Sequence, residues 1–164
     1  MIGAPAMGTE RLVAPLASAG DVPLLQAVLD ASPDYHLLTE GAPARPGAAS
    51  ELFADAEMDE DRALWVLRLR EVSQVAGLLD VQLHWPDPGA AHVRLLLLRP
   101  ALQGRGLGTE AVRALEALLR SEGFRILRLS VPHENGPARA FWERVGFAPA
   151  AELAERVTVY EKVL

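Results

Sequence analysis

A glycine-rich turn between an apolar run and an amphipathic segment is the feature that most constrains this chain. Leu95–Leu98 is an unbroken apolar run, typical of a strand covered on both faces, and Pro100 ends it because proline cannot donate to a sheet ladder. Gln103–Gly108 (QGRGLG) follows, and Thr109 opens a helix that runs to Ser121. Unpaired N–H groups at a helix start bind anions, and glycines let a ligand approach the main chain. The stretch therefore predicts a strand, an anion-binding turn and a helix.

Several kinds of site could use such a turn. A dinucleotide site favours G-x-G-x-x-G with an acidic residue closing the next strand, whereas here the glycines are Gly104, Gly106 and Gly108 and the next strand ends in Leu129–Val131. A P-loop needs a lysine after the last glycine, and Leu107–Thr109 offers none. A pyrophosphate site built from amides alone, or a turn that is tight for structural reasons only, stays open.

Composition limits the class of protein. The chain has 164 residues and is 50% hydrophobic, enough for one well-filled core, so we expect a single domain over residues 10–164 after a flexible segment 1–9. A net charge of −6 without a basic tract argues against a nucleic-acid partner and mildly favours a cationic substrate such as an amine. The sequence shows neither a signal peptide nor a membrane span, so we expect a cytoplasmic protein without a membrane partner.

The remaining pattern predicts a mixed sheet with helices on both faces. We expect strands over residues 11–16, 63–70, 75–85, 92–98, 125–131 and 157–164, and helices over 21–29, 48–57, 109–121 and 137–145. Residues 31–41 break the first helix, and residues 41–49 (GAPARPGAA) form a loop. The three strands from 63 to 98 should be antiparallel neighbours. The strand–helix–strand unit from 92 to 131 should make its two strands parallel through a right-handed crossover.

Two linked motifs resemble the landmarks of the GNAT acetyltransferase superfamily. Arg99–Gly108 (RPALQGRGLG) resembles its Q/R-x-x-G-x-G/A signature. Asn135–Phe147 (NGPARAFWERVGF) resembles its second landmark, N-x-x-A followed by an aromatic residue, E-K/R and G-F. The resemblance covers residues 62–150 well and the first 60 residues only by element order. It implies a mixed α/β, GNAT-like three-layer fold, with a central sheet of about six strands and helices on both faces.

The resemblance also implies acetyl-CoA as co-substrate, held in a wedge between the strands 92–98 and 125–131. Main-chain groups near Leu96 and Leu98 would pair with the pantetheine arm, and amides from Gln103 to Thr109 would hold the pyrophosphate. The implied cofactor-binding residues are Leu96, Leu97, Leu98, Gln103, Gly104, Arg105, Gly106, Leu107, Gly108, Thr109, Asn135, Phe141 and Trp142. Asn135 could equally cap a turn, and the two aromatic residues could equally belong to the core.

Direct attack of a bound primary amine on the thioester is the mechanism left, since the chain has no cysteine for an acyl-enzyme. The amine must first lose a proton, because an alkylamine has a pKa of roughly 10. The sequence departs from the family pattern at two positions. Trp142 stands where many members have a tyrosine that protonates the leaving thiolate, and Arg94 stands where many have a strand carboxylate. The general acid and the general base are therefore unassigned by the resemblance.

Asp80 is the best remaining candidate for the general base. It stands in the apolar stretch GLLDVQLHW, where burial should raise its pKa, although it could instead be a solvated residue on the outer face of a strand. His84 lies four residues on and should share its face. His92 and His133 could also serve. The four histidines show no metal-ligand spacing, so we predict no metal.

Tyr35, His84, Trp85 and the 41–49 loop are candidates for the acceptor pocket. The leading hypothesis is an acetyl-CoA-dependent N-acetyltransferase acting on a small-molecule or peptide amine. One rival is a non-catalytic acyl-CoA-binding or sensing module, and another is an NAD(P)- or nucleotide-binding enzyme. Antiparallel edge strands often pair between copies, which leaves a homodimer open.

Overall fold

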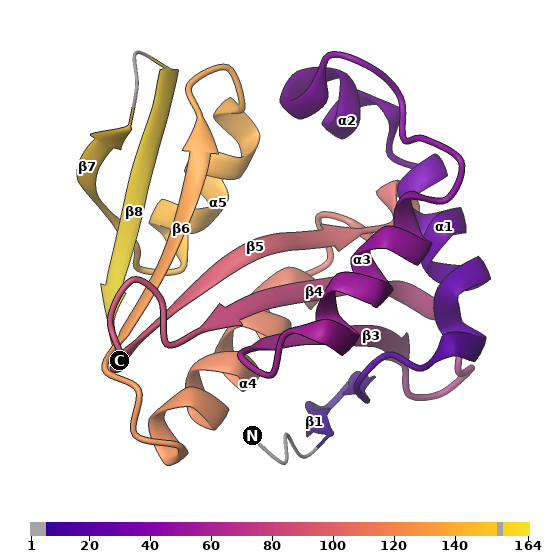
Figure 1. Cartoon of the computed structure of the whole chain (residues 1–164), viewed down its shortest axis with the longest axis horizontal. Coiled ribbons are helices and arrows are strands. Elements are labelled where there is room, and N and C mark those ends of the chain that lie inside the picture. The colour runs from indigo at the N-terminus through magenta and orange to yellow at the C-terminus, as the bar shows by residue number, and fades with distance from the viewer. Residues whose placement is uncertain (1–5, 154–155) are drawn as a thin grey trace.

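The computed structural model describes residues 6–153 and 156–164, and these residues form one sheet of eight strands with helices on both faces (Figure 1). The strands are β1 (Met7–Gly8), β2 (Leu12–Ala14), β3 (Arg62–Leu69), β4 (Val75–Leu83), β5 (Ala90–Leu98), β6 (Ile126–Pro132), β7 (Ala148–Leu153) and β8 (Val157–Val163). They lie in the order β1-β2-β3-β4-β5-β6-β8-β7, and among these described strands only β5 and β6 are parallel neighbours. The predicted mixed α/β fold is confirmed, with eight strands in place of about six.

Two apolar cores lie on the two faces of this sheet. The helices are α1 (Val22–Asp30), α2 (Pro33–Glu40), α3 (Ala48–Met58), α4 (Leu107–Ser121) and α5 (Gly136–Arg144), with 3₁₀ turns η1 (Ala19–Asp21) and η2 (Pro100–Leu102). The stripe of α4, including Leu115 and Leu119, packs on one face together with Trp142 of α5. Leu25 and Leu29 of α1 pack on the other face with residues of α3. Figure 1 shows α3 in front of the sheet and α4 behind it.

The first helix ends at Asp30, as the expected break at residues 31–41 requires, but the same residues also hold a helix that the pattern missed, because Pro33–Glu40 forms α2. Pro33 occupies the first turn, where its missing N–H is not needed, and Gly41 ends the helix in the left-handed conformation at φ 72°. The turn-forming residues thus mark the two ends of a helix and do not interrupt it. No helix among the described residues combines the length and the apolar composition needed to cross a bilayer.

The segment 1–9, expected to be flexible, includes a short edge strand. Met7 of β1 pairs with Ala14 of β2 and is buried. Residues 1–5 lie outside the described residues. The other strand that the pattern missed is β7, whose sequence APAAEL lacks the β-branched and aromatic residues typical of strands. It pairs with β8 at the opposite edge of the sheet.

Candidate active site

The parallel strands β5 and β6 part halfway along their length. They pair from Ala90 opposite Ile126 to Val93 opposite Leu129, and no further. Figure 1 shows the two strands diverging beyond this point. β5 stays paired with β4 on its other side as far as Leu98. One edge of the second half of β5 is therefore open to the gap between the strands.

The main-chain groups of Leu96 and Leu98 face this gap. The N–H of Arg99 donates to the carbonyl of Ala76 on β4 at 2.8 Å, and residues of an antiparallel strand bond alternately to either side. Leu97 therefore bonds toward β4, while Leu96 and Leu98 point away from it. The side chain of Gln103 confirms this direction, since its amide donates to the Leu98 carbonyl at 2.9 Å.

The glycine-rich turn follows β5 and leads into α4, whose first residues have no side-chain cap. Gly104 and Gly106 have φ values of 72° and 81°, a conformation that costs other residues about 1–2 kcal/mol. α4 begins at Leu107, two residues before the predicted start, and no side chain in the described part of the chain caps it at Gly106. The first helical hydrogen bond runs from the Glu110 N–H to the Gly106 carbonyl at 3.1 Å. The preceding N–H groups of α4 are therefore available to an anion.

Arg11, which the sequence did not indicate as a site residue, contacts this turn and the start of α4 from the N-terminal edge of the sheet. Its Nη1 donates to the Arg105 carbonyl at 2.9 Å, and its Nε contacts the carboxylate of Glu110 in the first turns of α4. Thr9 donates to the same carboxylate at 2.7 Å. Burial raises the pKa of Glu110, but these hydrogen bonds outweigh it and hold the pKa below its ordinary value. About a hundred residues separate the partners, so no local pattern could have revealed them.

The second motif contributes a cap, one aromatic residue beside the turn and one in the core. The Asn135 side chain accepts from the Ala138 N–H at 3.2 Å and so caps α5. Phe141 packs against the first turn of α4, since a Cβ on Gly108 would lie 3.2 Å from its ring. Trp142 is only 7% exposed and packs edge-on against another core aromatic. Phe141 thus lies beside the turn, whereas Trp142 fills the core.

A β-bulge turns Arg94 onto the sheet face that carries α1 and α3. On β4, Asp80 lies opposite Leu95 and Val81 lies opposite Val93, so Arg94 is the extra residue on β5. Leu95 packs into the core under α1 and α3, and the Nε of Arg94 lies 3.5 Å from the Asp80 carboxylate. The side chains of Arg94 and Asp80 therefore point to the same face of the sheet, at the place where β5 separates from β6.

Asp80 is buried and held by Arg62. Its side chain is 1% exposed, which excludes the alternative of a solvated outer residue. Nε and Nη2 of Arg62 donate to its two oxygens at 3.0 and 2.8 Å, and Arg62 also reaches Asp55 at 3.2 Å. The hydrogen bonds to Asp80 raise the pKa of Arg62 despite its burial. Because both oxygens already accept from Arg62, the geometry favours a positioning role for Asp80, and its role as general base stays a prediction.

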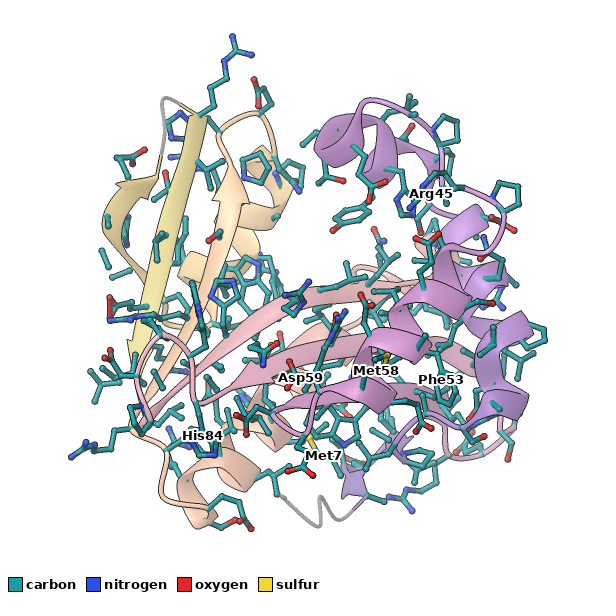
Figure 2. The ribbon with its side chains drawn as sticks, viewed as in Figure 1. Met7, Arg45, Phe53, Met58, Asp59 and His84 are labelled. Carbon is teal, nitrogen blue, oxygen red and sulfur yellow. The ribbon has the colours of Figure 1, made fainter. Side chains whose placement is uncertain are left out.

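A hollow of about 350 Å³ lies next to Arg94 on this face. Its lining residues are Gln82, Trp85, His92 and Arg94. The amide of Gln82 donates to Asp59 at 3.0 Å and to the Asp61 carbonyl at 3.3 Å. Figure 2 shows Asp59 beside the end of α3 and over the strands of the sheet. The hollow therefore lies over β4, β5 and the connection between them, which supply its four lining residues, and Asp59 and Asp61 hold one of these.

His92 is neutral in this environment. Burial, and then the nearby charges of Arg94 and Arg128, lower its pKa from 6.5 to about 4. The ring of Trp85 meets it edge-on at 4.9 Å between centroids. Its Nδ1 is buried without a hydrogen-bond partner among the described residues. Buried polar atoms are rarely left unpaired, so we expect a water or a ligand atom to pair with this Nδ1.

The separated strands, the uncapped helix and the order of the motifs agree with the family whose model matches residues 26–147, the Acetyltransferase (GNAT) family. This chain belongs to the GNAT acetyltransferase family. The predicted resemblance is confirmed over most of the chain, including part of the N-terminal region where the sequence motifs were thinnest.

Relatives and solved structures agree with this assignment. A mycothiol acetyltransferase from Beutenbergia cavernae is 40% identical over 81 residues, which are 49% of this chain and 27% of that protein, so the chain spans little more than a quarter of it. The structure of an acetyltransferase from Thermus thermophilus is 30% identical, with a TM-score of 0.85 over 98% of this chain and 100% of that one. A spermidine N-acetyltransferase from Vibrio cholerae, solved with CoA and spermine, shares the fold at 18% identity, with a TM-score of 0.76 over 94% and 96% of the two chains.

His84 and His133, two other histidines that the sequence singled out, do not line the hollow of this GNAT domain. His84 follows β4 at φ 54°, and this turn sends its ring against Phe124, at 4.8 Å between centroids, in the core under α4. Its expected place on the face of Asp80 is therefore wrong, because the alternation of the strand ends before it. Figure 2 shows His84 near the β4–β5 connection. His133 contacts Glu152 at 2.8 Å on the far side of β6 from β5.

Trp85 lines the hollow, and Tyr35 lies on α2 against the core under α1 and α3, while a part of either residue in an acceptor pocket stays a prediction. Burial raises the pKa of Tyr35, and the charges of Glu40 and Asp80 add to this effect. Because Tyr35 packs with residues of α1 and α3, α2 lies on the same side of the sheet as these helices.

Proposed function

We propose that this protein transfers an acetyl group from acetyl-CoA to a primary amine of a small molecule or peptide. The observation that carries the proposal is the parting of β5 from β6 after Val93 and Leu129, which leaves the main chain of Leu96 and Leu98 open beside the uncapped start of α4. The complex of the Vibrio cholerae protein with CoA and spermine supports both the donor and the class of acceptor. The likeness to a mycothiol acetyltransferase supports the reaction type.

The residues present suit a coenzyme A donor. A pantetheine arm carries amides, and the Leu98 N–H and the Leu96 carbonyl, which both face the gap, would bond to them as a neighbouring strand does. Leu97 would contribute less, because its main chain bonds toward β4 and its side chain packs under α1 and α3. The free N–H groups at the start of α4 would hold the diphosphate, and Gly104 leaves room for it since a Cβ there meets nothing within 4 Å.

Acetyl-CoA supplies an activated acetyl thioester. The Leu96 N–H would donate a hydrogen bond to the thioester oxygen and stabilise the negative charge that develops there during attack. The chain has no cysteine, so the amine nitrogen attacks directly: the new C–N bond forms, the C–S bond breaks, and the thiolate takes up a proton. The acceptor must enter as the free amine, after its ammonium proton has passed to solvent or to a side chain.

We assign Asp80 to positioning within this scheme. Its two oxygens hold Arg62, and the same carboxylate lies 3.5 Å from the Nε of Arg94 at the edge of the hollow. Asp80 would therefore fix the arginine that faces the acceptor, whereas a general base would need a lone pair directed at the amine. Replacing Asp80 with Asn separates the two roles, because loss of a base lowers kcat and loss of positioning raises KM.

Two measurements test the function. Calorimetric titration with acetyl-CoA should show binding, and a thiol-release assay over a panel of amines should show turnover with at least one of them. Absence of acetyl-CoA binding would contradict the proposal. Binding without thiol release from any amine would favour the second candidate, a non-catalytic acyl-CoA-binding module. That candidate is favoured by Trp142 in the place of the family's tyrosine and by the engagement of both Asp80 oxygens.

A further inference from the structure

We propose that the acceptor carries a carboxylate close to its amine and that Arg94 binds this carboxylate, so that the acceptor belongs to the class of amino acids. The inference rests on the proposed acetyl transfer and names the acceptor side of the same site. It is carried by the position of Arg94, by the state of its charge and by the neutral groups that share the hollow with it.

Arg94 lies where the acceptor must approach the thioester. It follows Val93, the last residue of β5 that pairs with β6, and precedes Leu96 by two residues. A strand rises about 3.3 Å per residue, so the two main-chain positions are about 7 Å apart. The bulge directs the Arg94 side chain to the face of the hollow, which it lines. A small molecule with its amine at the thioester therefore has its other end within reach of this guanidinium.

The charge of Arg94 is only partly neutralised. Among the described residues, the one carboxylate in contact with it is that of Asp80, whose two oxygens already accept from Arg62. That contact uses Nε at 3.5 Å, and the Arg94 side chain is 47% exposed. Its two terminal nitrogens make no hydrogen bond to any residue that the structure describes. A guanidinium with a free end binds a carboxylate through two parallel hydrogen bonds.

The other groups of the hollow suit an amine. Gln82 uses its amide nitrogen for Asp59 and Asp61, which leaves its carbonyl oxygen as an acceptor. His92 is neutral near pH 7 and also offers a lone pair. Trp85 supplies an apolar wall, and the volume of about 350 Å³ lies at the lower end of small-molecule sites. One cation beside neutral acceptors complements an amino acid, whereas a phosphate dianion would call for more than one free cation.

The test compares matched amines in the thiol-release assay. Each of the twenty amino acids is measured beside its decarboxylated amine where one exists, for example leucine beside 3-methylbutylamine, together with O-phosphoethanolamine. A charged hydrogen-bonded pair stabilises by about 1.5–3 kcal/mol, so the best amino acid should exceed its decarboxylated partner about 10- to 100-fold in kcat/KM. Arg94→Gln should abolish this preference, mainly through KM, and leave the acetyl-CoA Kd unchanged.

Arg120→Gln is the matched control. Arg120 is 49% exposed and lies 3.5 Å from the buried carboxylate of Glu116, a pairing like that of Arg94 with Asp80, but it stands in the last turn of α4. This variant should keep the preference. A second readout needs no turnover: N-acetyl amino acids should bind the CoA-saturated wild type in calorimetry and bind Arg94→Gln at least about 10-fold more weakly.

Equal activity on decarboxylated amines, a preference for O-phosphoethanolamine, or an unchanged preference in Arg94→Gln would each overturn the inference. So would the absence of Arg94-dependent binding of every N-acetyl amino acid to a protein that binds CoA. Failure of acetyl-CoA to bind at all would instead overturn the proposed function. Acetylation of amines without regard to a carboxylate would leave that function standing and remove only the role of Arg94.

Discussion

Val93 on β5 and Leu129 on β6 form the last pair at which these two parallel strands lie in register. Beyond this pair one edge of β5 is open, on the side where Leu96 and Leu98 present their main-chain groups. The start of α4 lies at the end of the same open edge, because η2 and the glycine turn follow β5 directly. The open strand edge and the start of α4 thus each present free N–H groups, at two places suited to an extended ligand that ends in a diphosphate.

Gly104→Ala tests whether the left-handed turn serves ligand binding. Gly104 has a φ of 72°, and a Cβ there meets nothing within 4 Å, so the change adds backbone strain without a clash. We expect a loss of about 1–2 kcal/mol in the free energy of unfolding and a clearly weaker affinity for acetyl-CoA, since the amides of the turn shift. Urea denaturation and calorimetry measure the two effects.

Gly123→Ala is its control. Gly123 has a φ of 87° and equally open surroundings, but it follows the other end of α4. This variant should lose similar stability and keep its affinity for acetyl-CoA. If both variants bound acetyl-CoA as wild type does, the glycine turn would not be the diphosphate site.

Asp80→Asn tests the buried ion pair. The change leaves the guanidinium of Arg62, whose side chain is 6% exposed, without its main counter-charge. Removing one partner of such a pair is strongly destabilising, and we expect a loss of about 3 kcal/mol because Asp55 still contacts Arg62. The free energy of unfolding in urea is the measurement.

An exposed ion pair gives the comparison for Asp80. Arg45 and Glu51 lie 2.6 Å apart with side chains 68% and 58% exposed, so Glu51→Gln should cost less than about 1 kcal/mol. If Asp80→Asn and Glu51→Gln both lost less than about 1 kcal/mol in the free energy of unfolding, the pair of Asp80 with Arg62 would not stabilise the fold more than an exposed ion pair does. A fall in kcat with KM unchanged in Asp80→Asn would restore Asp80 as a candidate base.

His92 should make stability depend on pH. Its pKa is about 4 in the folded protein and 6.5 as a free side chain, so the unfolded chain binds more protons between these values. The free energy of unfolding should therefore fall as the pH is lowered from 7 toward 4. His92→Gln lacks this contribution, and its stability should decline less over the same range in urea titrations. Parallel curves for the two proteins would show that the pKa of His92 is not depressed.

The main elements of the fold follow from local patterns. β3 alternates, β5 contains a short unbroken apolar run and α4 has a helical apolar stripe; these patterns indicate the type of each element, and all three were predicted together with β4. Helix α2 was missed because proline and glycine break a helix when they stand in its interior, whereas Pro33 stands at the first position of α2 and Gly41 at its end, where both residues are favourable. Strand β7 was missed because its residues have no strand preference and are held by pairing with β8.

The two halves of the site differ in how far sequence could predict them. The proposed donor site lies mostly on one continuous stretch, so the motif around Gly104–Gly108 indicated its place. The proposed acceptor site depends on a single extra residue at the Arg94 bulge and on an ion pair between Arg62 and Asp80, eighteen residues apart in sequence. An extra residue reverses the face of every later side chain on its strand, which no local pattern reveals. The positive φ of His84 likewise ends the alternation of β4, and this is why its expected position was wrong.

Amide hydrogen exchange, followed by NMR with and without acetyl-CoA, tests most directly where the donor binds. The N–H groups of Leu96 and Leu98 face the open gap, and those at the start of α4 lack helical partners. Binding in the gap should slow exchange at Leu96, at Leu98 and in residues 104–109, while Leu97, already bonded toward β4, should change little. Saturation with acetyl-CoA that left exchange at Leu96 and Leu98 unchanged would contradict donor binding between β5 and β6.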